Sequence, residues 1–186
     1  MEYFAFISGL LYLILEVRQK SIMWVVGVVS ATAYIIVFAQ SRLYAAMGLQ
    51  FYYAAVSLYG FYRWRKDKRT AKEQILYRII GPGDLVISLI LFALLFISLL
   101  TFLRNMTGDP MPFIDALATT LSIVATWWLS RSYIHQWLIW VAVNAMSVYL
   151  FFSQELYPTV LLYIIYTVCA LYGFYHWRRT GDEIKK

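Results

Sequence analysis

The chain has 186 residues, of which 62% are apolar, 14% are charged and one is cysteine. Soluble globular domains are nearer half apolar and a quarter charged, so the composition predicts an integral membrane protein and excludes a sizeable soluble domain and a disulfide framework. The net charge of +6 does not predict a nucleic-acid partner, because the basic residues follow the expected membrane topology.

Seven apolar stretches are long enough, or nearly so, to cross a bilayer, which takes about 20 residues. The first is short, and it lacks the basic leader and cleavage site of a signal peptide, so we expect a retained helix. A basic linker separates the third stretch from the fourth. The sequence thus predicts an all-α integral membrane protein with seven transmembrane helices, at residues 3–17, 23–39, 44–64, 84–103, 112–130, 134–152 and 157–177.

An internal repeat relates the two ends of the chain. The segment LYGFYRWR at residues 58–65 returns as LYGFYHWR at residues 171–178, and with this offset of 113 residues, 15 of the 48 positions from 18 to 65 are identical. Internal repeats are typical of secondary transporters, which bind substrate between the repeats. A unit of three helices ends on the side of the membrane opposite to the one where it began. A fourth helix, which has no counterpart in the repeat, crosses back and lets the second unit begin on the same side as the first. This predicts a 3+1+3 arrangement of parallel repeats.

The predicted organisation has four parts. They are a first three-helix repeat (1–64), a basic linker with the connecting helix (65–110), a second three-helix repeat (111–177) and a basic tail (178–186). With seven spans, one side carries 14 Lys and Arg residues and the other carries two, which predicts a cytoplasmic C-terminus and an external N-terminus. Trp64 and Trp177 end two repeat-related helices beside arginines, so we expect them in an interfacial aromatic belt. Asp84 is expected to cap the fourth helix.

The sixth predicted helix carries the first candidate for a substrate site. Trp137, Trp140 and Asn144 stand at i, i+3 and i+7, on one face of the helix. Two indoles beside a carboxamide suit a planar ligand with a hydrogen-bonding edge. The alternative interpretation is structural, with Trp137 in an aromatic belt and Asn144 in an interhelical hydrogen bond.

The third and seventh predicted helices add polar positions to the expected site. Thr159, Tyr163 and Tyr166 share one face of the seventh helix. Gln50 and Tyr53 offer hydrogen-bond donors and acceptors within the third. Hydrogen bonds between helices are the alternative role for all of these side chains.

Three further candidates lie in the first half of the chain. Glu16 is an acidic residue at the end of an apolar segment, and an intramembrane carboxylate is a functional candidate that would balance a cationic ligand. The alternative is an interfacial ion pair with Arg18 or Lys20. Trp24 and Tyr34 occupy the repeat positions that match the candidate face of the sixth helix. No residue spacing predicts a metal site, a cofactor or a catalytic group, so we do not expect an enzyme.

Several motifs resemble those of the PnuC-type vitamin transporters, and together they span residues 3–177. The most specific is the pattern of two tryptophans, a valine and an asparagine in the sixth helix. The matching segments are Trp137-x-x-Trp140-x-x-Val143-Asn144, Leu156-Tyr157-x-Thr159-x-x-Leu162-Tyr163, Gly173-x-x-x-Trp177, Trp24, and Leu43-Tyr44 with Leu49-Gln50.

The resemblance implies a 3+1+3 fold related to the sugar-transporting SWEET proteins, a bacterial inner-membrane location and a homotrimer. It also implies facilitated diffusion of an unphosphorylated vitamin, which cytoplasmic phosphorylation then traps. The residues that match Trp137, Trp140 and Asn144 line the substrate site in that family. Gln50 carries over as a further candidate.

The choice of vitamin rests on two departures from the family pattern. Thiamine and nicotinamide riboside both contain a cationic aromatic ring, which suits stacking on indole. Glu16 departs from the small or apolar residue of the nicotinamide riboside branch, and the chain lacks the longer N-terminal extension of that branch. We therefore expect thiamine, with nicotinamide riboside as the alternative.

Two other classes of membrane protein are remote alternatives. A SWEET-type sugar carrier typically has a Pro-Gln pair in its repeats, and none of the four prolines here precedes glutamine. A non-transporting protein, such as a receptor or the membrane subunit of an enzyme, would use the buried amides as structural contacts.

Overall fold

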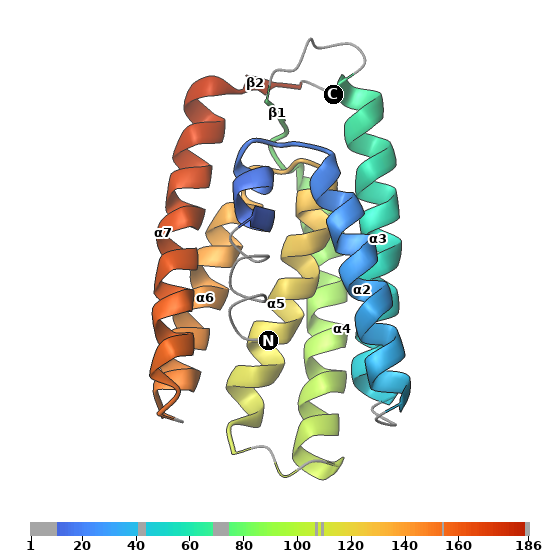
Figure 1. The fold of residues 1–186 in the computed structure, drawn as a ribbon, viewed down its shortest axis with the longest axis vertical. Coiled ribbons are helices and arrows are strands. Elements are labelled where there is room, and N and C mark those ends of the chain that lie inside the picture. The colour runs from blue at the N-terminus through green and yellow to red at the C-terminus, as the bar shows by residue number, and fades with distance from the viewer. Residues whose placement is uncertain are drawn as a thin grey trace.

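The computed structural model describes residues 11–40, 44–68, 75–106, 108, 110–153 and 155–184, and it is helical apart from one small strand pair (Figure 1). The prediction of seven helical segments is confirmed for this part of the chain, and residues 3–10 of the first predicted helix lie outside it. The strand pair is not foreseen by the apolar pattern. The elements are a helical segment at residues 11–17, α2 (Ile22–Gln40), α3 (Tyr44–Lys68), β1 (Leu76–Tyr77), α4 (Pro82–Met106), α5 (Pro112–Ser130), α6 (Gln136–Ser153), α7 (Tyr157–Thr180) and β2 (Asp182–Glu183).

Four helices, α4 to α7, are long and apolar enough to cross a membrane. α2 contains a shorter apolar stretch, Ile22–Ile36, and the tyrosines and charged end of α3 lower its hydropathy. α4 is the most apolar, yet only 6% of its apolar window is buried, so its side chains face outward on nearly all sides. The protein is therefore a multi-pass membrane protein. Crossing by all seven helices stays a prediction.

The helices form two pairs on either side of α5. α2 packs against α3 and α6 packs against α7, while α5 contacts α3, α4 and α6 (Figure 1). Residues 11–17 lie between the pairs, because Trp177 of α7 donates a 2.9 Å hydrogen bond to the carbonyl oxygen of Val17, and Tyr12 approaches Gly27 of α2. We call the end that holds β1 and β2 the basic end, and the end where α4 leads into α5 the opposite end.

The turns that follow residues 11–17 and α5 have the same backbone geometry. The Gln19 N–H donates to the Glu16 carbonyl at 2.9 Å, and the Ser132 N–H donates to the Leu129 carbonyl at 2.9 Å. Gln19 and Ser132 both have positive φ, at 48° and 60°. Each pair of equivalent residues is 113 positions apart, the offset of the sequence repeat. The two repeats therefore share backbone geometry even at positions where their side chains differ.

Two glycines of the repeated octapeptide make equivalent contacts with indole rings. A Cβ atom on Gly60 would lie 2.5 Å from the ring of Trp24, and one on Gly173 would lie 2.7 Å from the ring of Trp137. The octapeptide thus provides, in α3 and again in α7, a flat surface against which a tryptophan packs. Gly60 and Gly173 are 113 positions apart, and so are Trp24 and Trp137.

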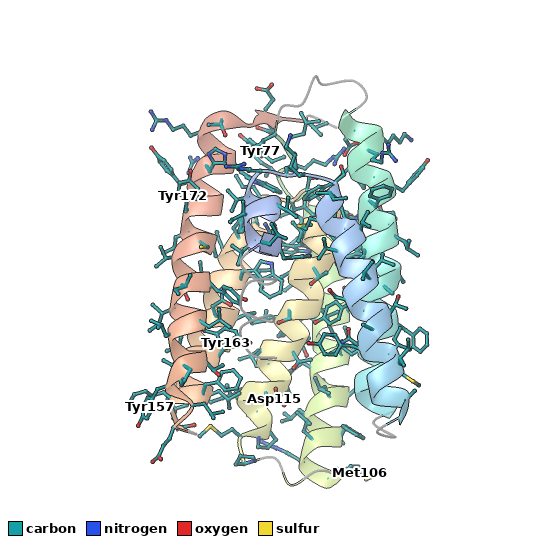
Figure 2. All side chains as sticks on the ribbon, in the orientation of Figure 1. Tyr77, Met106, Asp115, Tyr157, Tyr163 and Tyr172 are labelled. Carbon is teal, nitrogen blue, oxygen red and sulfur yellow. The ribbon has the colours of Figure 1, made fainter. Side chains whose placement is uncertain are left out.

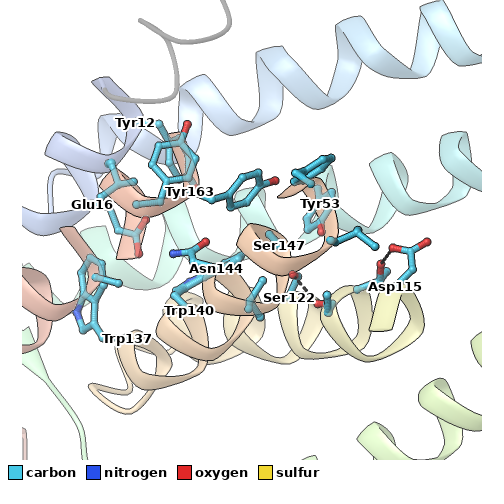
Figure 3. A pocket seen from close by; sticks show the side chains of 18 of the residues that line it. Tyr12, Glu16, Tyr53, Asp115, Ser122, Trp137, Trp140, Asn144, Ser147 and Tyr163 are labelled. Atoms are coloured by element: carbon cyan, nitrogen blue, oxygen red, sulfur yellow. Dashed lines mark hydrogen bonds between the residues drawn. The ribbon is translucent and has the colours of Figure 1, made fainter. Parts of the chain in front are cut away.

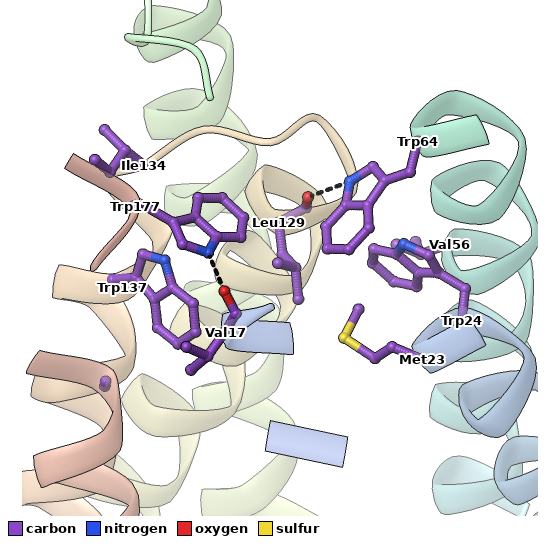
Figure 4. Close-up of a cluster of buried hydrophobic side chains, with 10 residues drawn as sticks. Val17, Met23, Trp24, Val56, Trp64, Leu129, Ile134, Trp137 and Trp177 are labelled. Atoms are coloured by element: carbon purple, nitrogen blue, oxygen red, sulfur yellow. Dashed lines mark hydrogen bonds between the residues drawn. The ribbon is translucent and has the colours of Figure 1, made fainter. Parts of the chain in front are cut away.

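Four tryptophans form a buried cluster near the basic end (Figure 4). Trp64 donates a 3.2 Å hydrogen bond to the Leu129 carbonyl, and Trp177 donates to the Val17 carbonyl, so each indole reaches into the other half of the chain. The prediction of an interfacial aromatic belt for Trp64 and Trp177 is wrong, because both rings lie inside the protein. The cluster comprises Trp24, Trp64, Trp137 and Trp177, none more than 1% exposed.

Residues 75–78 of the linker cross the basic end of the molecule, and we call this segment the strap. The side chain of Gln19 bonds both backbone groups of Leu76, at 2.6 and 2.8 Å. The Arg78 N–H donates to the Ser132 carbonyl at 2.8 Å, and β1 pairs in parallel with β2 of the C-terminal tail. The strap therefore holds both halves of the chain and the tail together.

The start of α4 is held to the second half by Asp84. This residue lies in the first turn of α4 and not at its cap, because the helix begins earlier, at Pro82. Its carboxylate accepts hydrogen bonds from Arg131 at 2.9 Å and from the hydroxyl of Tyr133 at 2.6 Å. Burial, together with the bond to Asp84, raises the pKa of Tyr133, so its hydroxyl remains a donor at neutral pH.

Candidate functional site

A cavity of about 400 Å³ lies between residues 11–17, α3, α5, α6 and α7 (Figure 3). Pockets for small organic ligands usually have volumes of about 300–1,000 Å³. The lining combines aromatic rings with a few hydroxyl, amide and carboxyl groups. This arrangement suits the binding of a small, partly aromatic molecule.

Most of the site residues predicted from the sequence line this cavity. They come from residues 11–17, α3, α6 and α7, so segments far apart in the sequence meet at one place. Their roles toward a ligand remain predictions. The residues are Glu16, Tyr53, Trp137, Trp140, Asn144, Tyr163 and Tyr166.

The other four predicted site residues lie outside the cavity lining. Trp24 is buried in the tryptophan cluster, and Tyr34 is 49% exposed. Gln50 directly follows a lining residue, but successive residues are about 100° apart around a helix, which turns Gln50 away from the cavity. Thr159 is half-buried in the first turn of α7. The face of α3 that borders the cavity therefore includes the predicted Tyr53 but carries Leu49 in place of Gln50.

α6 provides one wall of the cavity, with its two tryptophans in different settings. Trp137 is 1% exposed and fixed by packing, since it contacts Gly173 and meets Trp177 edge-on with ring centroids 5.5 Å apart. Trp140 is half-buried, which leaves more of its ring available to a ligand. Asn144 follows one turn later and is 5% exposed. Trp140 and Asn144 are thus the members of the motif best placed to contact a ligand.

α7 provides an aromatic wall. Tyr163 stacks on Phe151 of α6, with ring centroids 5.3 Å apart, and meets Tyr166 edge-on at 5.8 Å. Tyr53 of α3 also lines the cavity. These contacts between rings hold flat apolar surfaces in place along the length of the cavity.

Glu16 lies at the basic end of the cavity. It is only 5% exposed, and its Oε1 atom has no hydrogen-bond partner among the described residues. An interfacial ion pair, the alternative role for Glu16, fits this burial poorly. Figure 3 places its carboxylate on the same side of the cavity as Trp137.

α5 provides a polar stripe that the sequence analysis did not single out. Asp115, Ala118, Thr119 and Ser122 stand at i, i+3, i+4 and i+7, and all four line the cavity. The signal was present in the sequence as small and polar residues at helical spacing in an apolar segment. Tyr12, one turn before Glu16, is a second lining residue that was missed.

The electrostatic character of the cavity follows from its lining. Glu16 and Asp115 are acidic, and none of the described lining residues is Lys, Arg or His. A cleft lined by charges of one sign attracts ligands of the opposite sign. The described lining therefore offers acidic groups to a cation and no basic group to an anion.

Comparison with known families identifies the chain. Residues 1–179 match the family model described as nicotinamide mononucleotide transporter. The chain belongs to this family. The predicted membership of the PnuC-type vitamin transporters is thus confirmed, and the protein is a transporter and not an enzyme.

Individual relatives cover nearly the whole chain. The nicotinamide riboside transporter PnuC of Escherichia coli (strain K12) is 29% identical, over 95% of this chain and 84% of its own length. PnuC of Haemophilus influenzae is 25% identical, over 93% and 76%. The riboflavin/roseoflavin transporter RibM of Streptomyces davaonensis is 26% identical, over 92% and 81%.

A solved structure shares the fold. The crystal structure of the vitamin B3 transporter PnuC aligns with a TM-score of 0.69 and 22% identity, over 94% of this chain and 79% of that one. These matches leave no support for a SWEET-type sugar carrier or a non-transporting protein. They also favour the nicotinamide riboside alternative over thiamine, since the relatives reported above are described as carriers of other vitamins.

Proposed function

We propose that this PnuC-family protein carries unphosphorylated nicotinamide riboside across the membrane by facilitated diffusion. The observation that carries the proposal is the acidic, aromatic cavity, which has no basic residue in its described lining. Nicotinamide riboside has a cationic pyridinium ring and no anionic group, so it matches this cavity. The relatives in Escherichia coli and Haemophilus influenzae are described as nicotinamide riboside transporters, which supports the same choice.

The charge of the cavity argues against the phosphorylated compound in the family description. A phosphate monoester carries a charge of about −1.5 to −2 at pH 7. Asp115 would repel it, and none of the described lining residues offers a compensating cation. Phosphorylation after entry would therefore lower affinity for the carrier and trap the vitamin in the cell.

In the proposed binding mode, the pyridinium ring packs against Trp140. A cation–π contact of this kind contributes about 0.5–2 kcal/mol. The carboxamide of Asn144 has both donors and acceptors, so it can pair with the carboxamide of the ligand. Glu16 would offset the charge of the ring, and Tyr163 would cover its other face. We assign no substrate contact to the four predicted residues outside the cavity.

We further propose that the chain is a 3+1+3 duplication of the SWEET-like kind, in the bacterial inner membrane. Support comes from the equivalent turns at Gln19 and Ser132 and from the equivalent Gly60 and Gly173 contacts, each offset by 113 residues. The basic residues favour a cytoplasmic C-terminus and an external N-terminus. We also propose a homotrimer, on the family resemblance alone. The proposed division of the chain into four parts rests on the repeat.

A binding titration on purified protein in detergent tests the proposed substrate. Nicotinamide riboside, nicotinamide mononucleotide, thiamine and riboflavin would be compared by calorimetry, and uptake of labelled nicotinamide riboside measured in proteoliposomes. We expect nicotinamide riboside to bind best and the mononucleotide at least about tenfold more weakly. Tighter binding of thiamine or riboflavin would contradict the proposal.

A tryptophan variant tests the site. We expect Trp140→Ala to weaken nicotinamide riboside by about tenfold or more, because it removes a stacking surface. Trp128→Phe is the matched control, since Trp128 bonds Ser88 at 2.9 Å and does not line the cavity. Unchanged affinity in Trp140→Ala would place the substrate elsewhere.

A further inference from the structure

Asp115 lies at the end of the cavity farthest from Glu16. Figure 3 shows Glu16 and Trp137 on one side, Asp115 on the other, and Asn144 between them. Figure 2 shows Asp115 well toward the opposite end of the molecule, away from Tyr77 at the basic end. The two carboxylates therefore do not form a cluster. Each would contact a different part of one elongated ligand.

The surroundings of Asp115 are rich in hydrogen-bond acceptors. Asp115 stands in the first turn of α5, where the helix dipole favours a negative charge. The Thr119 hydroxyl donates to Asp115 Oδ1 at 3.5 Å, which leaves the Thr119 oxygen as an acceptor. The Ser122 hydroxyl donates its proton to the Ala118 carbonyl at 2.8 Å, which leaves the Ser122 oxygen as an acceptor. This stripe suits a part of the ligand that brings hydroxyl donors.

We propose that Asp115 is a specificity-determining residue whose carboxylate accepts hydrogen bonds from the sugar hydroxyls of the substrate. The inference rests on the proposed function and adds an orientation to it. The cationic ring would lie near Glu16 and Trp140, and the sugar would lie toward the opposite end. Acidic side chains recognise ribose in the same way in dinucleotide-binding folds, where an Asp or Glu bonds the 2′-hydroxyl.

This role has two consequences for selectivity. A site built to bond a hydroxyl binds an analogue that lacks it less tightly, because the hydrogen bonds to that hydroxyl are lost. The cavity should therefore prefer a riboside to the ring alone. A phosphate carried on the sugar would also lie beside Asp115, so the same carboxylate would repel the mononucleotide.

The test compares two cations that differ in the sugar. Nicotinamide riboside and 1-methylnicotinamide share the charged ring and its carboxamide, but only the first has hydroxyl groups. We expect Asp115→Asn to weaken nicotinamide riboside by about 10- to 100-fold, as for the loss of hydrogen bonds to a charged group. The affinity of 1-methylnicotinamide should change less than about twofold. An equal loss for both cations, or no loss for either, would overturn the inference.

A charge-preserving variant separates hydrogen bonding from long-range attraction. Asp115→Glu keeps the charge and moves the carboxylate by one methylene, so we expect it too to weaken the riboside selectively. Unchanged riboside affinity in this variant would mean that Asp115 acts only through its charge. Glu155→Gln is the matched control, because Glu155 is an exposed carboxylate in the α6–α7 connection and lies outside the cavity.

The wild-type titration distinguishes the two proposals. If the wild type does not bind nicotinamide riboside, the proposed function fails and the role of Asp115 fails with it. If the wild type binds it and the Asp115 variants affect both cations alike, only the role of Asp115 is wrong. Retained binding of 1-methylnicotinamide shows that a variant is folded.

Discussion

The side-chain amide of Gln19 lies 3.5 Å from the hydroxyl of Ser132, the residue that follows it by one repeat length. Both residues are 1% exposed and both have positive φ. A contact between two equivalent residues places them beside the axis that would relate the two halves. Gln19 also bonds both backbone groups of Leu76 in the strap, so one side chain links three parts of the chain.

Replacement of Gln19 should destabilise the protein. In Gln19→Ala, the N–H and carbonyl of Leu76 lose their side-chain partner, and an unsatisfied buried group costs about 1–3 kcal/mol. We expect a clear fall in the thermal unfolding temperature in detergent. Ser153→Ala is the control, because Ser153 is exposed and such changes usually alter stability by less than about 0.5 kcal/mol. Equal unfolding temperatures for both variants would mean that Gln19 does not secure the strap.

The two repeated glycines should differ in their effect on function. An added methyl group at Gly60 or Gly173 would overlap an indole ring, and overpacking of this kind costs about 1–3 kcal/mol. Trp137 lines the cavity and Trp24 does not. Gly173→Ala should therefore lower both stability and nicotinamide riboside affinity, whereas Gly60→Ala should lower stability alone.

Thermal unfolding and ligand titration of the same preparations check this difference. Gly48→Ala is the control, because an added Cβ there meets nothing within 4 Å. It should be neutral or slightly stabilising, since alanine favours a helix more than glycine does. Loss of ligand affinity in Gly60→Ala to the same degree as in Gly173→Ala would argue against this account.

The sequence was most informative where a regular pattern repeats. Apolar stretches and the 113-residue offset predicted the helical segments, because long apolar runs leave few alternatives to a helix in a membrane. Helical spacing also placed Trp137, Trp140 and Asn144 on one face, and the structure brings them to one cavity. The face of α3 that borders the cavity was harder to predict, since both faces of that helix carry polar and aromatic side chains. Of the two residues chosen on α3, Tyr53 lines the cavity, whereas Leu49 lines it in place of Gln50.

Features that depend on packing between halves were not accessible from the sequence. Tryptophans beside arginines are typical of membrane interfaces, yet Trp64 and Trp177 are buried because each bonds a carbonyl of the other half. The β1–β2 pair joins two-residue strands that are too short to show a periodic pattern. Asp115 was overlooked because it closely follows Pro110 and Pro112, and an acidic residue beside such turn signals is common.

The bond between Tyr133 and Asp84 predicts a loss of stability at alkaline pH. Burial raises the pKa of Tyr133 above its ordinary value of 10.0, and the bond to Asp84 adds to this. The folded state then holds the phenolic proton more tightly than the unfolded state, so this contribution to stability is complete below pH 10 and falls as the pH rises through the folded-state pKa. Thermal unfolding should show a steeper decline above about pH 10 in the wild type than in Tyr133→Phe. Parallel curves for the two proteins would exclude the effect.

Glu16 should determine the preference for a cationic ring. The reduced form of nicotinamide riboside has the same sugar and carboxamide but a neutral ring, so it is a matched ligand without the charge. A bound ring cation favours the ionised form of Glu16, and the ionised carboxylate then attracts the ring. Glu16→Gln removes this attraction and keeps the shape of the side chain, so we expect the affinity for the oxidised form to fall by about tenfold. The affinity for the reduced form should be unchanged, because a neutral ring gains little from the carboxylate. Calorimetric titration of both forms against both proteins measures the change in their ratio. A ratio that stays constant would show that Glu16 contributes no charge recognition, and the cation preference of the cavity would then have to come from Asp115 and the aromatic walls.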